Sequence, residues 1–447
     1  MEPSDAQRWL KAPSRGRVSV HSQLAKEIET HLFGGDGTIG KPNDRFLLLC
    51  ASGRTDHEVR DEISDLVRLD LDWPGLLDTA RHHGLLSLLY HRLQDLETEP
   101  ASLPAPILAE FQLAYYSTLA HNARLEVDLV DVVQILRREG VEVVVLKGGA
   151  LASTVYGNPA LRPMGDLDLL VRVEQVQSAL AALQAAGFRL TSSVPDYMLP
   201  FQGRFGGGIV LERRVEGHAT HLDIQHHLLS VDWCRPLFPA REEAFWQAAR
   251  PLDLNGTRTW QLSAEDTLIF LCLHLALNHG YSFPLIAYAD LDWLVRRAGP
   301  DLSWARLLRR AARFRVRTVV YYSLLGAARL LATPVPDEVM AGLSPPPWRL
   351  RLLQRLAPRD PARLLAEGAA KPSGIHQVLI YAALADRLRD IAAMLRAVLF
   401  PSHEWLAVRY ALDDDRQLRF YRLTHPLRVF RSILRGFWRP LWKSGLQ

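Results

Sequence analysis

Hydrophobic and polar positions follow three successive patterns along the chain. From 45 to 138 apolar residues recur at three- and four-residue steps, which predicts amphipathic helices. Between 139 and 255 short β-branched or alternating runs, such as "VEVVVLKGG" and "GDLDLLVRV", predict strands, with a helix over "EQVQSALAALQAAGF". Helical spacing returns after Ser263, which is a favourable N-cap residue. We therefore expect an α+β fold, with a small mixed sheet and its helices flanked by helical regions.

These patterns divide the chain into five parts. At 447 residues the chain exceeds one ordinary core, so more than one domain is expected. We predict a partly flexible N-terminus at 1–44, a helical region at 45–138, an α/β core at 139–255, a second helical region at 256–343 and a basic helical region at 344–447. Further strands of the core are expected at 189–191, 208–213 and 220–226.

Composition and charge narrow the class of protein only slightly. Hydrophobic residues make up 48% and charged residues 23%, which is ordinary for a globular protein, and a net charge of +4 does not by itself indicate nucleic acid. The three cysteines lie far apart and show no disulfide framework. The N-terminus lacks the apolar core of a signal peptide, and no apolar run of about eighteen residues occurs. We expect a cytoplasmic protein without a transmembrane segment.

Three aspartates are candidates for a metal site. Asp166 and Asp168 stand two apart on a predicted strand, so their side chains share one face. Two carboxylates side by side repel each other unless a cation lies between them, and a hard cation such as Mg²⁺ suits carboxylate oxygens. Asp223 alternates with apolar residues in "THLDIQHHL" and supplies a third carboxylate if that strand lies beside the first. Such a set suits two-metal phosphoryl chemistry.

A glycine pair precedes these aspartates. Gly148 and Gly149 follow a buried strand and precede a helix, and without a Cβ they let phosphate oxygens approach the backbone. Lys147 and Arg162 can supply positive charge to a polyphosphate. These four residues are therefore candidates for nucleotide binding.

The order of these features resembles a known superfamily. A strand, Gly-Gly, a helix, Asp-x-Asp on the next strand and a lone acid on a later strand resemble the polymerase-β-like nucleotidyltransferase fold. The segment "LKGGALASTVYGNPALRPMGDLDLLV" resembles in particular an uncharacterised nucleotidyltransferase family, with Lys-Gly-x-Ala-Leu at its start and Arg-Pro-x-x-Asp-x-Asp at its end. It is similar also to antibiotic nucleotidyltransferases. The resemblance extends over roughly 46–332.

The resemblance implies roles for individual residues. Gly148 and Gly149 match the phosphate-binding turn, Asp166 and Asp168 match the two metal ligands, and Asp223 matches the third, which also helps to activate the acceptor hydroxyl. Many members have Gly-Ser where this chain has Gly-Gly, so a serine contact to the phosphates is lost here.

The function implied is transfer of a nucleoside monophosphate from an NTP, with ATP the expected nucleotide, to a hydroxyl-bearing small molecule, peptide, protein or RNA. Mg²⁺ or Mn²⁺ is the implied cofactor, and 256–343 is expected to form the acceptor cleft. Two alternatives stay open. One is an inactive nucleotide- or partner-binding module of the same fold, and the other is a membrane- or RNA-associated scaffold.

The scaffold alternative rests on the C-terminal segment 416–443, which carries arginines, one lysine, interleaved aromatic residues and no acid. Packing of a helix on the catalytic body is the simpler reading, and Pro426 and Pro440 are expected to break any continuous helix.

Other polar clusters favour structural roles. Asp290 and Asp292 repeat the Asp-x-Asp spacing, but on a helix, where they point apart, and are expected to face solvent or cap. His274 and His279 are expected to pack within a helix. Four histidines between 218 and 227 match no structural zinc spacing.

Overall fold

The computed structural model describes nine stretches of the chain: 41–96, 103–191, 205–215, 217–229, 232–239, 242–281, 284–356, 375–412 and 414–438. The predicted flexible N-terminus lies almost wholly outside these residues, and so does the end of the basic C-terminal segment, including Pro440.

Within the described residues, five helices precede the sheet, as the periodicity predicts: α3 (Pro42–Ala51), α4 (His57–Val67), α5 (Trp73–His82), α6 (Leu86–Gln94) and the long α7 (Ala105–Arg138). Side-chain caps begin two of them, because Asp56 accepts a hydrogen bond from the Val59 amide at α4 and Asp72 from the Gly75 amide at α5. The C-terminal half of α7 runs along the sheet and buries Val132 and Leu136 against it.

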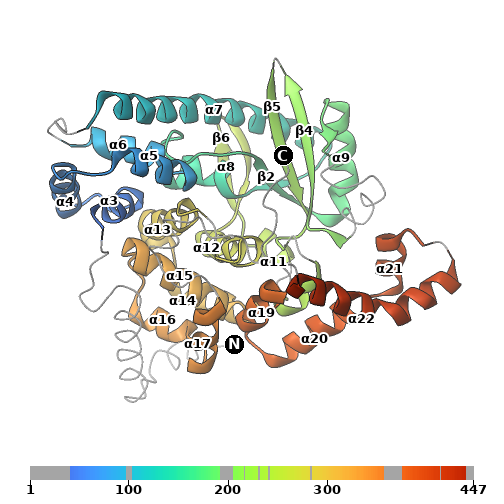
Figure 1. Ribbon diagram of the computed structural model, residues 1–447. Helices are drawn as coiled ribbons and strands as arrows, with labels where there is room; N and C mark the ends of the chain where they lie inside the picture. The colour runs from blue at the N-terminus through green and yellow to red at the C-terminus, as the bar shows by residue number, and fades with distance from the viewer. Residues whose placement is uncertain are drawn as a thin grey trace, which may run out of the picture.

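A seven-stranded mixed sheet forms the centre of the molecule (Figure 1). Its strands are β1 (Val143–Val145), β2 (Leu167–Val171), β3 (Arg189–Leu190), β4 (Gly208–Val215), β5 (His218–Gln225), β6 (Arg250–Leu254) and β7 (Thr257–Gln261), in the order β3-β4-β5-β2-β1-β7-β6. The pairs β2–β5 and β1–β7 are parallel and the others antiparallel. With α9 (Val176–Ala185) and α7 packed on it, the predicted α+β fold is confirmed.

The β6–β7 hairpin was not predicted. Asn255 and Gly256 form its turn with φ of 51° and 87°, the left-handed region that a tight hairpin turn requires. Because β7 pairs in parallel with β1, through Val144 opposite Trp260, the sheet continues beyond the predicted boundary at 255.

A short helix, α11 (Glu242–Trp246), lies between β5 and β6, and further helices follow the sheet. Those in the described residues are α12 (Ala264–Leu273), α13 (Ile286–Ala298), α14 (Trp304–Phe314), α15 (Arg317–Leu331), α16 (Asp337–Leu343), α17 (Pro347–Leu356), α19 (Ile375–Leu384), α20 (Leu388–Leu399), α21 (His403–Tyr410) and α22 (Asp415–Trp438). Ser263 caps α12 by accepting a hydrogen bond from the Asp266 amide, as its sequence predicts. One large apolar core joins α3–α6, α12–α15 and α19–α20.

The expectation that Pro426 would break the C-terminal helix is wrong, because α22 passes through it. The neighbouring residue explains why. The His425 side chain is buried, with Nδ1 3.1 Å from the Tyr410 hydroxyl and Nε2 3.1 Å from the Val398 carbonyl oxygen. These tertiary contacts hold the helix in place across the lost backbone hydrogen bond.

No single helix in the described stretches is both long enough and apolar enough to span a membrane. One bent pair, α20 with α21 at 47°, does pass the same length and hydropathy test.

Candidate active site

Two neighbouring strands bring the predicted carboxylates together. β2 and β5 run parallel, and their register sets Asp168 directly opposite Asp223. The alternating residues Leu167, Leu169 and Leu222 are buried, as the pattern predicts for the core-facing side of both strands. β5 thus lies beside β2, which is the condition under which Asp223 supplies a third carboxylate.

Asp166 lies directly before β2 and is exposed. Burial raises the pKa of both Asp168 and Asp223, and the nearby charge of Asp166 adds to the rise in each. The three carboxylates therefore belong to one electrostatic cluster. Nevertheless, across the described ranges no three His, Cys, Asp or Glu side chains are close enough to enclose a metal ion.

Lys147 points at this cluster. Its Nζ donates a hydrogen bond to Asp168 Oδ1 at 2.6 Å, and both side chains are largely buried. Its φ of 41° puts the backbone in the left-handed region, which a residue with a side chain adopts at the expense of strain. In this conformation the chain turns at the end of β1, and the ammonium group of Lys147 reaches the Asp168 carboxylate.

Gln225 bridges the two buried aspartates. Its Nε2 donates to Asp168 Oδ1 at 2.8 Å and to Asp223 Oδ2 at 3.1 Å. Strand alternation places Gln225 on the same face as Asp223, but the sequence reading gave it no role. The sequence did offer a sign of this role, because Gln225 is a polar residue two positions after Asp223 on the same strand.

Asp223 is the least satisfied member of the cluster. Its Oδ1 is buried without a hydrogen-bond partner, and burial, followed by the charge of Asp168, raises its pKa to about 7. Space at this oxygen is kept by Gly208 on β4, because a Cβ there would stand 2.6 Å from Asp223 Oδ1. Gly208 was not predicted as a site residue.

The glycine turn lies at the start of α8 (Lys147–Leu151), which continues into the π-helical turn η1 (Ala152–Tyr156). A Cβ on Gly148 would stand 2.7 Å from Arg162 Nη1 and 2.8 Å from Met164 Cγ. Glycine is therefore required for close packing of the segment that leads into β2, in addition to any contact with phosphate.

Arg162, predicted to contact nucleotide, is held by Asp290 of α13. Its Nε and Nη2 donate to Asp290 Oδ1 and Oδ2 at 3.2 and 2.9 Å, and Tyr156 donates its hydroxyl to Oδ1 at 2.9 Å. The guanidinium lies near enough to Asp168 to oppose the rise in the pKa of that carboxyl, which burial causes.

The expectation that Asp290 and Asp292 face solvent or cap a helix is wrong, because their exposed fractions are 2% and 0%. The helix that carries them lies inside the large apolar core, where carboxylates are tolerated only when paired.

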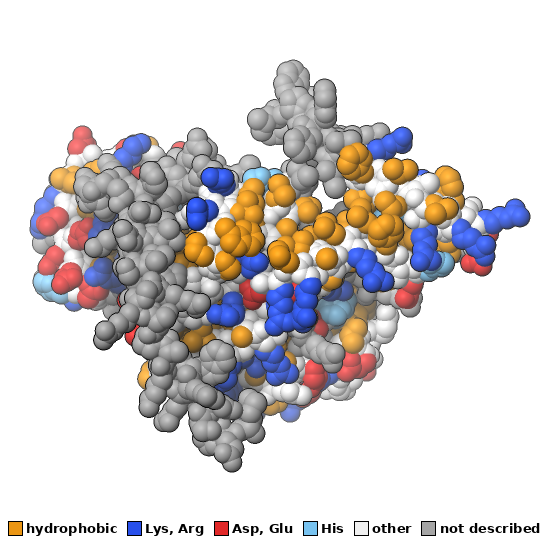
Figure 2. Space-filling view, turned by 90° about the horizontal axis from the view of Figure 1, so that it is seen from below, with side chains coloured by type: hydrophobic (Ala, Val, Ile, Leu, Met, Phe, Trp, Pro, Cys, Tyr) orange, Lys and Arg blue, Asp and Glu red, His pale blue; other side chains and the backbone are white. Residues whose placement is uncertain are grey.

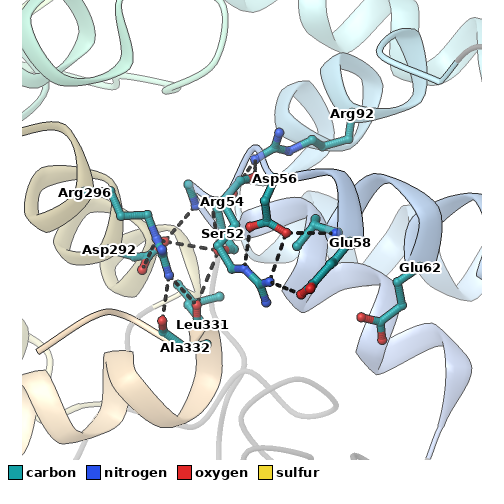
Figure 3. A network of polar contacts seen from close by, with 12 residues as sticks. Ser52, Arg54, Asp56, Glu58, Glu62, Arg92, Asp292, Arg296, Leu331 and Ala332 are labelled. Carbon is teal, nitrogen blue, oxygen red and sulfur yellow. Dashed lines mark hydrogen bonds and ion pairs between the residues drawn. The ribbon is translucent and has the colours of Figure 1, made fainter.

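Asp292 accepts hydrogen bonds from several elements (Figure 3). The Gly53 amide donates to Oδ2 at 2.7 Å, the Thr333 hydroxyl to Oδ1 at 2.7 Å, and Arg296 Nε to both oxygens at 2.9 and 3.0 Å. Asp292 thus ties the end of α3 and the end of α15 to α13.

Two histidines of the second helical region contact each other. His274 and His279 face each other with their Nε2 atoms 3.0 Å apart, within and after the π-helical turn η5 (His274–Asn278).

Comparison with known proteins identifies the family. Residues 70–332, more than half of the chain, match the family model described as "Uncharacterised nucleotidyltransferase". The chain belongs to that family. The matched range includes the glycine turn, all three aspartates, Gln225 and Asp290, and it begins somewhat later than the 46 expected from the sequence.

Two further comparisons add little to the family assignment. No curated protein matches. Among solved structures, an antigenic nucleotidyltransferase-like protein from Paracoccidioides brasiliensis is 15% identical, over 48% of this chain and 95% of its own, with a TM-score of 0.33. At that TM-score the likeness carries no argument about this nucleotidyltransferase family member.

Proposed function

We propose that this protein transfers a nucleoside monophosphate from an NTP, ATP being the expected one, to a hydroxyl-bearing acceptor. The observation that carries the proposal is the opposed pair Asp168 and Asp223, one of whose oxygens is buried without a partner, beside a glycine turn in a nucleotidyltransferase family member.

The cluster has the chemistry of a divalent-cation site. Its donors are carboxylate oxygens, the ligands that Mg²⁺ and Mn²⁺ prefer, and the unpaired Oδ1 of Asp223 calls for a cation or a proton. Asp168 and Asp223 would hold the ion, and the exposed Asp166 would complete the set by turning toward it. When bound, such an ion neutralises charge on the phosphates and on the leaving pyrophosphate.

The surrounding residues orient these carboxylates. Gln225 fixes the spacing of Asp168 and Asp223 through one amide nitrogen, and Lys147 supplies a countercharge to Asp168. Asp223 would align the acceptor hydroxyl and take its proton at Oδ1 as the acceptor oxygen bonds to the α-phosphorus. The bond from that phosphorus to the β-phosphate bridging oxygen then breaks, and pyrophosphate leaves.

The acceptor remains to be found, and the helices at 256–343 are proposed to form its cleft. A small molecule, a peptide or protein side chain, and an RNA end all offer the hydroxyl that this chemistry needs. We propose that the chain is organised in the five parts given above, with β7 of the 256–343 part joining the sheet of the core.

A second candidate function is a nucleotide-binding module without chemistry. It is favoured by Lys147, whose ammonium group already lies 2.6 Å from Asp168 Oδ1, and by Gly149 in place of the serine common in the superfamily.

Calorimetry with each of the four NTPs, with and without Mg²⁺, separates these functions when combined with a transfer assay. We expect metal-dependent binding of one NTP that is lost in Asp166→Asn/Asp168→Asn, and metal-dependent release of pyrophosphate. Binding that needs no metal and yields no pyrophosphate would favour the binding module.

A further inference from the structure

The C-terminal helices leave large apolar side chains in solvent. On α22 the exposed residues Phe420, Leu423, Leu427 and Phe430 follow one another at three- and four-residue steps, so they form a single stripe along the helix. This stripe points away from the protein, because the opposite side of α22 carries the buried His425. An amphipathic helix of a globular protein normally turns such a stripe inward.

Neighbouring helices extend the apolar surface. α20 exposes Leu388 and Leu395, with Phe400 directly after it, and α17 exposes Trp348. α22 packs on α20 and α19, and α19 packs on α17, so these helices form one layer. Figure 2 looks at this side of the molecule and shows hydrophobic side chains gathered in a band. We call this surface of α17, α19, α20 and α22 the C-terminal apolar face.

Positive charge accompanies the face. The described residues from 344 to 438 contain thirteen arginines and five acids, and none of the acids lies between 416 and 438. Of those five, Asp390 is paired with Arg315, and Asp386 accepts from the Arg317 and Thr318 amides. On α22, the exposed Arg419 and Arg431 stand at the two edges of the apolar stripe.

From these observations we propose that the C-terminal apolar face binds the surface of an anionic lipid bilayer, with α22 lying in the plane of the interface. An outward apolar stripe edged by arginines is the pattern of helices that insert shallowly beneath phosphate headgroups. Each arginine near an anionic surface adds attraction that salt screens. The proposal is independent of the catalytic one, because it uses none of the site residues.

The aliphatic side chains favour lipid over nucleic acid. RNA-binding surfaces combine arginines with aromatic rings on which bases stack. Leu388, Leu423 and Leu427 offer no stacking surface, yet they are the most exposed apolar side chains of the face, at 67%, 79% and 64%.

Vesicle sedimentation with the full chain tests the proposal. Vesicles of phosphatidylcholine alone are compared with vesicles in which about a third of the lipid is phosphatidylglycerol. We expect binding to the anionic vesicles that weakens with added salt. Leu423→Ser/Leu427→Ser should weaken it by about tenfold or more, because two aliphatic side chains no longer enter the interface.

Matched variants control for folding and for charge. Leu113→Ser/Val127→Ser on α7 removes side chains that are 63% and 70% exposed, against 79% and 64% for the test pair, and should bind like the wild type. Arg419→Gln/Arg431→Gln should reduce both binding and its salt dependence, which keeps the test valid if the leucine variant folds poorly. Absence of binding to anionic vesicles would overturn the proposal. So would binding that survives the leucine substitutions and is competed by single-stranded RNA, which would assign the face to nucleic acid.

Discussion

Two Asp-Leu-Asp segments of the chain, one at the candidate site and one in α13, have surroundings that differ in kind. At the site, Asp168 and Asp223 share a single amide nitrogen, one lysine pairs with Asp168 alone, and an oxygen of Asp223 has no partner. In α13, Asp290 receives two guanidinium nitrogens and a tyrosine hydroxyl.

Secondary structure produces this difference. On a strand, residues two apart share a face, so like charges are pressed together and a ligand must compensate them. On a helix they diverge, and each of Asp290 and Asp292 meets its own arginine. Two carboxylates that the protein leaves partly unpaired thus indicate chemistry, whereas fully paired ones indicate structure.

The largest expected effect comes from breaking the paired set. Asp292→Ala should lower the free energy of unfolding by about 3–5 kcal/mol, because Arg296 and the Gly53 amide lose their buried partner. Urea denaturation followed by circular dichroism measures the change. Asp166→Ala, at the exposed end of the other pair, should stay within about 0.5 kcal/mol of the wild type. Equal losses in the two variants would contradict the distinction between the pairs.

The next effect is on catalysis. Asp168→Asn should reduce pyrophosphate release by about 10²- to 10³-fold, because the buried carboxylate is the best-placed charge in the cluster. A labelled-NTP assay gives the rate, and thermal denaturation shows whether the fold is kept. Asp70→Asn, at an exposed position, should leave the rate unchanged. Wild-type turnover by Asp168→Asn would move the site elsewhere.

The local pattern predicted most of the helices and strands. It also predicted which side chains of the two acidic strands share a face, because side chains alternate between the two faces of a strand. The β6–β7 hairpin was within reach of the same reasoning through its Asn-Gly turn. Register added what the pattern alone could not supply, namely that Asp168 stands opposite Asp223.

Contacts between distant elements were beyond the sequence. Arg162 and Asp290 are 128 positions apart, and nothing local shows that α13 is buried deeply enough to require the pairing. The continuation of α22 through Pro426 likewise depends on His425 and its partners on two other elements. The direction of the Lys147 side chain depends on a positive backbone φ, which the residue type does not favour.

A smaller effect concerns stability and pH. Burial, followed by the charge of Asp168, raises the pKa of Asp223 from 3.8 to about 7, so the folded state keeps a proton between those values that the unfolded chain releases. The folded state therefore loses stability as the pH rises through this window. Asp223→Asn should be more stable than the wild type above pH 7, by about 1–2 kcal/mol, and should gain little near pH 4. Thermal denaturation in EDTA at both pH values tests this, and a gain that is the same at both would contradict it.

The smallest effect expected is that of Gln225→Ala. The amide is not expected to touch the reacting atoms, so its loss should act through the spacing of the two carboxylates that it bridges. We expect turnover to fall by about tenfold, with a raised requirement for Mg²⁺ in the assay, as for other residues that orient metal ligands. Gln225→Glu is the sharper comparison, because it keeps the length of the side chain but adds a third charge beside Asp168 and Asp223. If the glutamate variant needs less Mg²⁺ than the alanine variant, the cluster accepts a cation. If both variants behave like the wild type, the bridge has only a structural role, and the unpaired oxygen of Asp223 no longer supports a cation site.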